Sequence, residues 1–364
     1  MLKIVRSEFL PFLLVSFLLL FFSCSVQKTG LPGTTGHKFY PPPPDTTRIQ
    51  YLTTISTSDD ISGEQSGFSR FLFGEQEPVS IVKPYGITSY KDRIYICDTG
   101  IGGIVIIDLI KGTLRQFIPE GKGQLQLPLN CDTDSDGNLY IADGNRRQVV
   151  VFDSDGNYLY ALGEKDTTFR PTGVAVAGNN IWVASISDHR VYKYKKDEPG
   201  VLAGYIGGEP GSSDYLYQPA SIFCRDGLVF VSDVGDYRVK VFGEDGSYTR
   251  NIGSYGNSSG QFMRPKGLTA DRELNTYVVD AAFENVQIFN SSGQLLMYFG
   301  GPYSSPGDMW LPAGVAVDYS NLDYFNKYVD PEFELQYLVY VTNQYGPGKI
   351  GVYGFVKIKE QQPR

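Results

Sequence analysis

The sequence is poor in histidine, the most common protein ligand of zinc and a frequent general base. Its 364 residues include two, His37 and His189. His37 lies in a Gly- and Pro-rich stretch outside the repeats described below, so the repeats contain a single histidine. A zinc centre with several histidine ligands and a catalytic pair of histidines are therefore both excluded.

Cysteine is also scarce. Besides Cys24 near the N-terminus, the sequence has Cys97, Cys131 and Cys224, with no C-x-x-C or C-x-x-C-H pattern. The sequence therefore indicates neither a redox pair nor covalently bound haem. Each of the last three occupies a position that other repeats fill with a small or apolar residue, so we expect free, buried thiols.

Runs of positive charge are missing as well. The chain has 32 basic and 40 acidic residues, which gives a net charge of −8. Proteins that bind nucleic acid need a basic stripe, patch or tail to neutralise phosphates. We therefore do not expect nucleic acid as a partner.

What the sequence does contain is an internal repeat. Six copies each open with a proline, at intervals of 44, 43, 48, 46 and 47 residues. The opening residues are Pro84, Pro128, Pro171, Pro219, Pro265 and Pro312. The copy Gln218–Gly253 shows the pattern most clearly, with the apolar runs LVFVSD and RVKVF separated from their neighbours by Asp-Gly turns. Each copy therefore predicts four short antiparallel strands.

A period near 45 residues with four strands per copy is the pattern of a β-propeller. We predict an all-β fold, a six-bladed β-propeller over residues 46–358, with four-stranded antiparallel blades starting near 84, 128, 171, 219, 265 and 312 and a tail at 359–364. The last repeat lacks room for a fourth strand, whereas residues 46–56 alternate like a strand and precede the first repeat. We expect this N-terminal strand to close the last blade.

The repeats resemble the NHL repeat. Three patterns that recur between about Pro84 and Phe355 carry the resemblance: P-x-G-V-A-V-D, D-G-N-x-Y-V-A-D and N-x-R-V-x-V-F-D. The tripeptide Asp188–His189–Arg190 is the closest match to the letters that name the family. This resemblance implies a propeller that binds partners through its faces. It does not imply one chemistry, since the fold supports many.

The N-terminus resembles a bacterial lipoprotein signal. Residues 1–23 carry Lys3 and Arg6, then a run of apolar residues, then Ser23. In such signals the next residue, here Cys24, is lipidated, and Ser25 resembles the sorting signal for the outer membrane. An uncleaved membrane anchor is the alternative. Residues 24–45, rich in Gly, Thr and Pro, are expected to form a tether.

The longer connections between blades carry exposed aromatic residues among glycines and serines, which is typical of a binding surface. The candidate partner-binding residues there are Tyr215, Tyr217, Tyr255, Phe262, Tyr303 and Trp310. An insertion at 319–336, between the first two strands of the last repeat, adds Tyr324, Phe325 and Tyr328. For both sets the alternative is that the rings only pack against the blades.

Carboxylates recur where second strands end, at Asp98, Asp143, Asp233 and Asp280. A catalytic group is usually needed once, so recurrence favours hydrogen bonds that order the adjoining loop. The series Asp132, Asp134, Asp136 and Asp143 also matches the spacing of a calcium-binding loop. Because strands rather than helices flank it, we regard it as a weak metal candidate.

Together these features predict a non-enzymatic binding or scaffold lipoprotein of the bacterial cell envelope, lipid-anchored in the outer membrane, with a protein or glycan partner and no cofactor. The alternative is a calcium-dependent lactonase or hydrolase of the propeller type, with its site at the central channel. The first strands show no convincing ring of Glu and Asn for such a metal centre.

Overall fold

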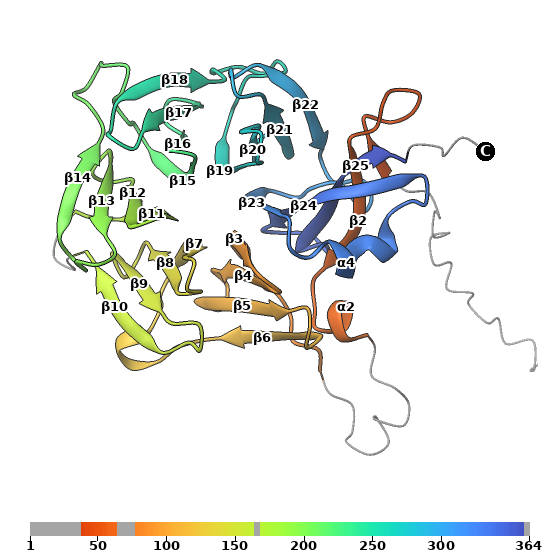
Figure 1. Cartoon of the computed structure of the whole chain (residues 1–364), viewed down its shortest axis with the longest axis horizontal. Coiled ribbons are helices and arrows are strands. Elements are labelled where there is room, and N and C mark those ends of the chain that lie inside the picture. The colour runs from red at the N-terminus through yellow and green to blue at the C-terminus, as the bar shows by residue number, and fades with distance from the viewer. Residues whose placement is uncertain (1–37, 64–76, 164–167, 360–364) are drawn as a thin grey trace, which may run out of the picture. The chain divides into compact units, whose positions relative to one another are not determined.

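The computed structural model describes residues 38–63, 77–163 and 168–359. Figure 1 shows six antiparallel sheets arranged in a ring, with the first strand of each sheet innermost. The predicted six-bladed propeller is confirmed. In the same described ranges, no helix combines the length and apolar character that crossing a membrane requires. The predicted leader, Cys24 and residues 360–364 of the predicted tail lie outside these ranges.

Blades 1 to 5 are four-stranded meanders. Blade 1 contains β3 (Pro84–Tyr90), β4 (Arg93–Asp98), β5 (Gly103–Asp108) and β6 (Thr113–Phe117). Blade 2 contains β7 (Pro128–Thr133), β8 (Leu139–Asp143), β9 (Gln148–Phe152) and β10 (Tyr158–Leu162). Blade 3 contains β11 (Pro171–Ala177), β12 (Asn180–Ser185), β13 (Arg190–Lys195) and β14 (Leu202–Ile206). Blade 4 contains β15 (Pro219–Arg225), β16 (Leu228–Asp233), β17 (Arg238–Gly243) and β18 (Tyr248–Ile252). Blade 5 contains β19 (Pro265–Ala270), β20 (Thr276–Asp280), β21 (Asn285–Phe289) and β22 (Leu295–Gly300).

Blade 6 joins the two ends of the described chain. Its strands β23 (Pro312–Asp318), β24 (Phe333–Asn343) and β25 (Ile350–Ile358) are followed in the sheet by β2 (Ile49–Ile55) and β1 (Lys38–Tyr40). The N-terminal closing strand is therefore confirmed, as β2 pairs antiparallel with β25. The fifth strand β1 was not expected, because residues 38–40 belong to the stretch assigned to the tether.

The Asp-Gly turns between strands fold as the sequence pattern predicts. At the hairpin between β9 and β10, the carboxylate of Asp153 accepts hydrogen bonds from the N–H groups of Asp155 (2.9 Å) and Asn157 (2.8 Å). Gly156 then adopts φ = 90°, which only glycine reaches without strain. The side chain thus replaces backbone partners at the point where the chain reverses.

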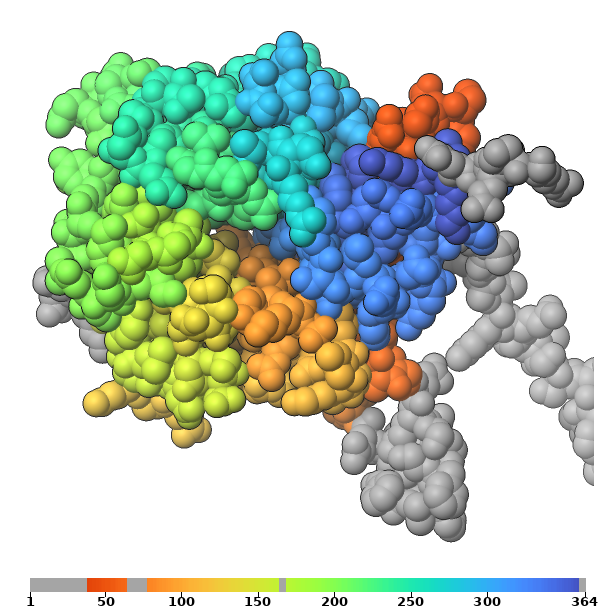
Figure 2. Space-filling model, viewed as in Figure 1, coloured from red at the N-terminus to blue at the C-terminus, as the bar shows by residue number. Residues whose placement is uncertain are grey.

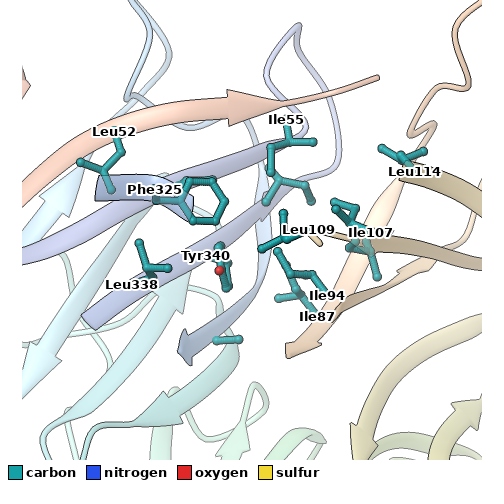
Figure 3. Close-up of a cluster of buried hydrophobic side chains, with 14 of the residues drawn as sticks. Leu52, Ile55, Ile87, Ile94, Ile107, Leu109, Leu114, Phe325, Leu338 and Tyr340 are labelled. Carbon is teal, nitrogen blue, oxygen red and sulfur yellow. The ribbon is translucent and has the colours of Figure 1, made fainter. Parts of the chain in front are cut away.

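The hydrophobic core consists of six clusters, each of which fills the space between two neighbouring blades. Figure 3 shows the cluster between blades 6 and 1, where Leu52 and Ile55 of β2 lie with Ile87 of β3 and Ile107 of β5. Second strands and most third strands are buried along nearly their whole length, so they read as continuous apolar runs, and burial of this surface holds the ring together.

The three cysteines of the propeller are free thiols, as expected. Cys97 and Cys131 are buried between blades 1 and 2, and burial raises the pKa of Cys97 well above its usual value. Cys224 is only half-buried, so the expectation of burial holds for two of the three.

Candidate binding face and central channel

The crossings between blades and the loops between second and third strands lie on one face, which we call the crossing face. The crossings between blades 3 and 4, 4 and 5, and 5 and 6 are residues 207–218, 253–264 and 301–311. The opposite face carries the turns between first and second strands, including α4 (Leu322–Phe325) and the short 3-10 helix η2 (Asn326–Tyr328). A second 3-10 turn, η1 (Gly121–Gly123), lies in the crossing between blades 1 and 2.

Buried carboxylates hold the crossings in place. Asp143 accepts hydrogen bonds from Gln126 (2.6 Å) and Leu127 (2.9 Å) in the incoming crossing and from Asn145 (3.2 Å) and Arg146 (2.9 Å) in the following loop, all through backbone N–H groups. Asp98, Asp233 and Asp280 also bind the N–H groups of their incoming crossings. Bonds from several backbone donors to a charged acceptor are strong, so the predicted structural role of these residues is confirmed.

A second repeating feature was not anticipated. The residue before each third strand adopts a left-handed conformation in four blades, at Arg147, His189, Tyr237 and Glu284, with φ between 54° and 61°. From this position Nδ1 of His189 lies 2.6 Å from the carbonyl oxygen of Tyr217, and Oε1 of Glu284 accepts a hydrogen bond from the N–H of Leu311 (2.8 Å). Both side chains therefore contact backbone groups of the next crossing and help to fix its position. Alignment of the repeats identifies this position, but not its conformation.

Aromatic rings pair on the crossing face. Tyr303 and Trp310 are stacked with centroids 5.7 Å apart, and the rings of Tyr237 and Tyr255 are 4.7 Å apart. Tyr215 contacts Tyr217 edge to face at 4.8 Å. Trp310 is 47% exposed and Tyr255 is 60% exposed. Backbone held by buried carboxylates thus presents paired, half-exposed rings to solvent.

Two of the predicted contact residues are buried, which corrects the expectation that they face a partner. Phe262 is fully buried between blades 4 and 5, where it packs on Phe289 at 5.5 Å. A bridge between Tyr255 and Phe262 folds this crossing back on itself, so that Tyr255 remains outside while Phe262 points inward. Phe325 is fully buried in the cluster between blades 6 and 1, against Tyr340.

The rest of the insertion in blade 6 also packs against the ring. Tyr324 and Tyr328 are half-buried against the same cluster as Phe325. The hydroxyl of Tyr324 donates to the carbonyl oxygen of Ile61 in α2 (Asp59–Ser62), at 3.2 Å. The carbonyl oxygen of Tyr328 accepts from Gln50 of β2, at 3.0 Å. These contacts favour the alternative that the insertion is a packed loop over the closing strand.

The four carboxylates of the weak calcium candidate do not converge. Asp134 closes its own turn through Asn138 and pairs with Lys196 at 2.7 Å. Burial alone would raise the pKa of Asp134, but the bonds from Lys196 and Asn138 leave that pKa below its usual value. Asp143 is engaged at the crossing face, whereas Asp132 lies in the channel. In the described part of the chain, no group of three or more His, Cys, Asp or Glu side chains is placed to hold a metal.

First strands line the central channel, and glycines allow neighbouring first strands to approach closely. A Cβ atom on Gly267 would lie 2.5 Å from the carbonyl oxygen of Ala313, and one on Gly314 would lie 2.4 Å from that of Tyr85. Neighbouring first strands therefore approach so closely that a side chain does not fit between them. This close contact explains the glycine of the Pro-x-Gly pattern. Figure 2 shows a narrow opening at the centre of the ring.

A cavity of about 320 Å³ lies between the first strands and extends from Gly267 and Gly314 toward the opposite face. Its polar lining includes Asp132, Asp134, Arg225 and Thr269. Burial raises the pKa of Asp132 to about 6, although its carboxylate accepts hydrogen bonds from the N–H groups of Val176 and Thr133, both at 2.8 Å. The cavity can hold a small polar molecule.

No model of a known protein family matches the chain. A curated relative, the E3 ubiquitin-protein ligase NHLRC1 of Homo sapiens, is 28% identical over 82 residues, which are 22% of this chain and 21% of that protein. The chain thus matches about a fifth of the relative's length. Together with the ring of six sheets, this short match supports the NHL-like pattern of the repeats. The chain is a six-bladed β-propeller.

Solved structures agree with this NHL-like propeller in fold. Virginiamycin B lyase from Staphylococcus aureus is 17% identical with a TM-score of 0.52, and the match covers 78% of this chain and 86% of the lyase. A structural genomics protein of unknown function from Bacteroides thetaiotaomicron is 14% identical with a TM-score of 0.58, over 85% of this chain and 76% of the other. At these identities the likeness concerns the fold alone.

Proposed function

We propose that this protein is a non-enzymatic binding or scaffold lipoprotein of the bacterial cell envelope, and that its crossing face binds a protein or glycan. The signal-like segment at residues 1–23 and Cys24 support attachment to a membrane, in the outer membrane by the resemblance of Ser25. The propeller supplies a rigid disc whose face is fixed by hydrogen bonds from the crossings to buried carboxylates.

The observation that carries the proposal is the pairing of exposed aromatic rings on that face. Tyr and Trp add large contact area at a low cost in side-chain entropy, and they dominate the energy of binding surfaces. The pairs Tyr303–Trp310 and Tyr237–Tyr255 are held against each other before any ligand arrives. A pre-organised surface loses less conformational entropy on binding.

The test is a triple variant, Tyr255→Ala, Tyr303→Ala and Trp310→Ala, in the full chain. Crosslinking in intact cells and a glycan array are both run on wild type, on this variant and on the control Tyr298→Ala. Tyr298 is 52% exposed but lies on the outer strand β22, away from the crossings. Loss of each anchor costs about 2 kcal/mol, so the specific neighbours or glycans of the wild type should disappear in the triple variant alone. An unchanged pattern would contradict the proposal.

Membrane attachment has a separate test. In Cys24→Ser the acceptor of the lipid is missing, so the chain should lose incorporated fatty acid and leave the membrane fraction. A variant that stays membrane-bound without fatty acid would favour the uncleaved anchor instead.

A second candidate function is a hydrolase or lactonase working from the channel. The observation that favours it is Asp132, whose raised pKa and place in the cavity suit a general acid or base. Purified protein should then contain one divalent ion per chain, and activity should be lost both on chelation and in Asp132→Asn. Absence of a stoichiometric ion would exclude the calcium-dependent form.

A further inference from the structure

At the crossing end of the channel, a buried lysine has no acceptor. Lys266, the second residue of β19, is 6% exposed. Its Nζ lies 5.0 Å from the centroid of the Tyr85 ring, on the far side of blade 6. Across residues 38–63, 77–163 and 168–359, no oxygen accepts a hydrogen bond from this ammonium group and no carboxylate pairs with it. Most of the lysine side chain is removed from water while its ammonium group has no counter-charge, a costly arrangement that calls for an explanation.

Two further cations lie close enough for their charges to act on Lys266. Lys83 and Arg264 directly precede the opening prolines of blades 1 and 5, and neither side chain forms an ion pair within the described ranges. Nζ of Lys83 lies 5.3 Å from the ring centroid of Tyr345, which is half-exposed. In a chain with eight more acidic than basic residues, three unpaired cations at one end of the channel are not a product of composition.

The carboxylates that end the second strands of blades 5 and 1 are already hydrogen-bonded. Asp280 accepts hydrogen bonds from the backbone N–H groups of Met263 (2.7 Å) and Arg264 (3.1 Å), and Asp98 accepts from those of Val82 (2.6 Å) and Lys83 (2.8 Å). Both carboxylates bind backbone groups of the crossings. The three cationic side chains therefore receive no counter-charge from blades 5 and 1, in which they lie.

The positions of these residues follow from the repeat. Each first strand begins at the crossing face with its proline, and the glycines at 267 and 314 bring β19 and β23 into close contact. In blade 6, Ala313 occupies the position equivalent to Lys266 and Tyr85. Its methyl group leaves room for the long lysine side chain to reach from blade 5 to the ring of Tyr85 on blade 1. The ammonium group thus lies at the mouth of the channel.

We propose that Lys266, Lys83 and Arg264 form a binding site for a compact oxyanion, a carboxylate or a phosphate group, at the crossing end of the channel. The anion supplies the counter-charge that the chain lacks, and Tyr85 and Tyr345 limit the size of the group that enters. The site goes beyond the proposed function, because it stands even if the aromatic pairs bind nothing. It adds that a ligand of the crossing face carries a negative group at its centre.

The protonation of Lys266 is consistent with such a site. Its pKa is lowered to about 8, first by burial and then by the positive charges of Arg264 and Lys83. An oxyanion bound beside the ammonium would favour the charged form and raise this pKa again. A lysine that served only packing would show no such response.

The experiment titrates the full chain with inorganic phosphate and, separately, with acetate, at pH 7 and constant ionic strength set with chloride. The thermal midpoint is followed at pH 7, and the pKa of Lys266 is determined by NMR in a pH titration with and without each anion. We expect a saturable rise of the midpoint with at least one anion and an upward shift of that pKa. Phosphate alone or acetate alone would identify which oxyanion fits. No saturable response to either would overturn the proposal.

Variants locate the effect. Lys266→Met should abolish the response, and Lys83→Met should weaken anion affinity about tenfold, the loss of one charge-assisted contact. The matched control is Lys122→Met, an exposed lysine of another crossing, which should respond like wild type. If Lys266→Met does not fold, the double variant Lys83→Met, Arg264→Met replaces it. A response retained in both would place the anion elsewhere. Neither result depends on the aromatic triple variant, so the two proposals can fail separately.

Discussion

Blades 4 and 5 each bury a lysine side chain near the crossing face. One of these lysines pairs with carboxylates, and the other has no carboxylate partner. Lys240 on β17 is 1% exposed and lies 2.8 Å from the carboxylate of Asp236 and 3.8 Å from that of Asp233, and it donates to the carbonyl oxygen of Tyr215. Lys266 is almost as buried and has only the ring of Tyr85. A buried charge that is fully paired supports the fold, whereas one left unpaired is available to a ligand.

The largest expected effect comes from breaking the paired lysine. In Lys240→Met, Asp233 stays buried without its cation and the crossing at 207–218 loses the bond to Tyr215. Removing one partner of a buried pair costs about 3–5 kcal/mol. Urea denaturation should show this decrease in the free energy of unfolding, with Lys122→Met as control. A variant as stable as wild type would mean that Lys240 contributes nothing as a pair.

Replacing the unpaired lysine should raise the free energy of unfolding, which is the opposite of the effect at Lys240. In Lys266→Met at pH 7 and without anion, the free energy of unfolding should rise by about 2–3 kcal/mol, since a folded pKa of about 8 against 10.5 for the free side chain opposes folding. Above pH 8 the folded protein releases this proton while the unfolded chain keeps it, so wild type gains stability as pH rises. The difference should vanish by about pH 10.5. Parallel denaturation curves from pH 6 to 10 measure it, and a destabilised variant would contradict this explanation.

A smaller effect is expected at the other end of the channel. The folded pKa of Asp132, about 6, lies above its value of 3.8 in a free side chain, so wild type loses stability as pH rises from 4 to 6. Asp132→Asn keeps an oxygen for the N–H groups of Val176 and Thr133 but carries no charge. It should match wild type at pH 4 and exceed it by about 1 kcal/mol at pH 7. Equal stability at both pH values would show that the carboxylate is well solvated.

The smallest effect is expected at Lys83, which lies outside the core and acts on the charge of Lys266. Lys83→Met removes one of the two cations that lower the pKa of Lys266, so that pKa should rise, while stability changes by less than about 0.5 kcal/mol because Lys83 is half-exposed. An NMR titration of Lys266 reports the change. A pKa that does not move would place Lys83 too far away to act on the site.

The propeller could be predicted from the sequence because its pattern is repeated six times. Proline opens every first strand, whereas glycine two residues later and aspartate at the end of the second strand each occur in four of the six blades, and each reflects a backbone requirement of the repeat. The closing strand could be predicted as well, since the last repeat visibly lacked one. The three-residue strand β1 was missed because Lys38–Tyr40 directly precede four prolines, which suggested a tether.

The candidate site was only partly predictable. Aromatic loops could be recognised, but the same composition covers Tyr255, which is exposed, and Phe262, which is buried by a turn within its own crossing. Lys266 was overlooked because a single lysine in a repeat has no counterpart to align with. What distinguishes it from Lys240 is the absence of a neighbouring acceptor, and that depends on which blades meet at the channel mouth.

The pairing of β2 with β25 has a consequence for how the molecule is made. These strands are about 300 residues apart in sequence. During synthesis, β2 is therefore made long before β25, the strand with which it pairs. Until β25 arrives, the interface between the first and last wedges stays open, with apolar surface and an unsatisfied strand edge exposed to neighbouring molecules. Contacts so distant in sequence form slowly.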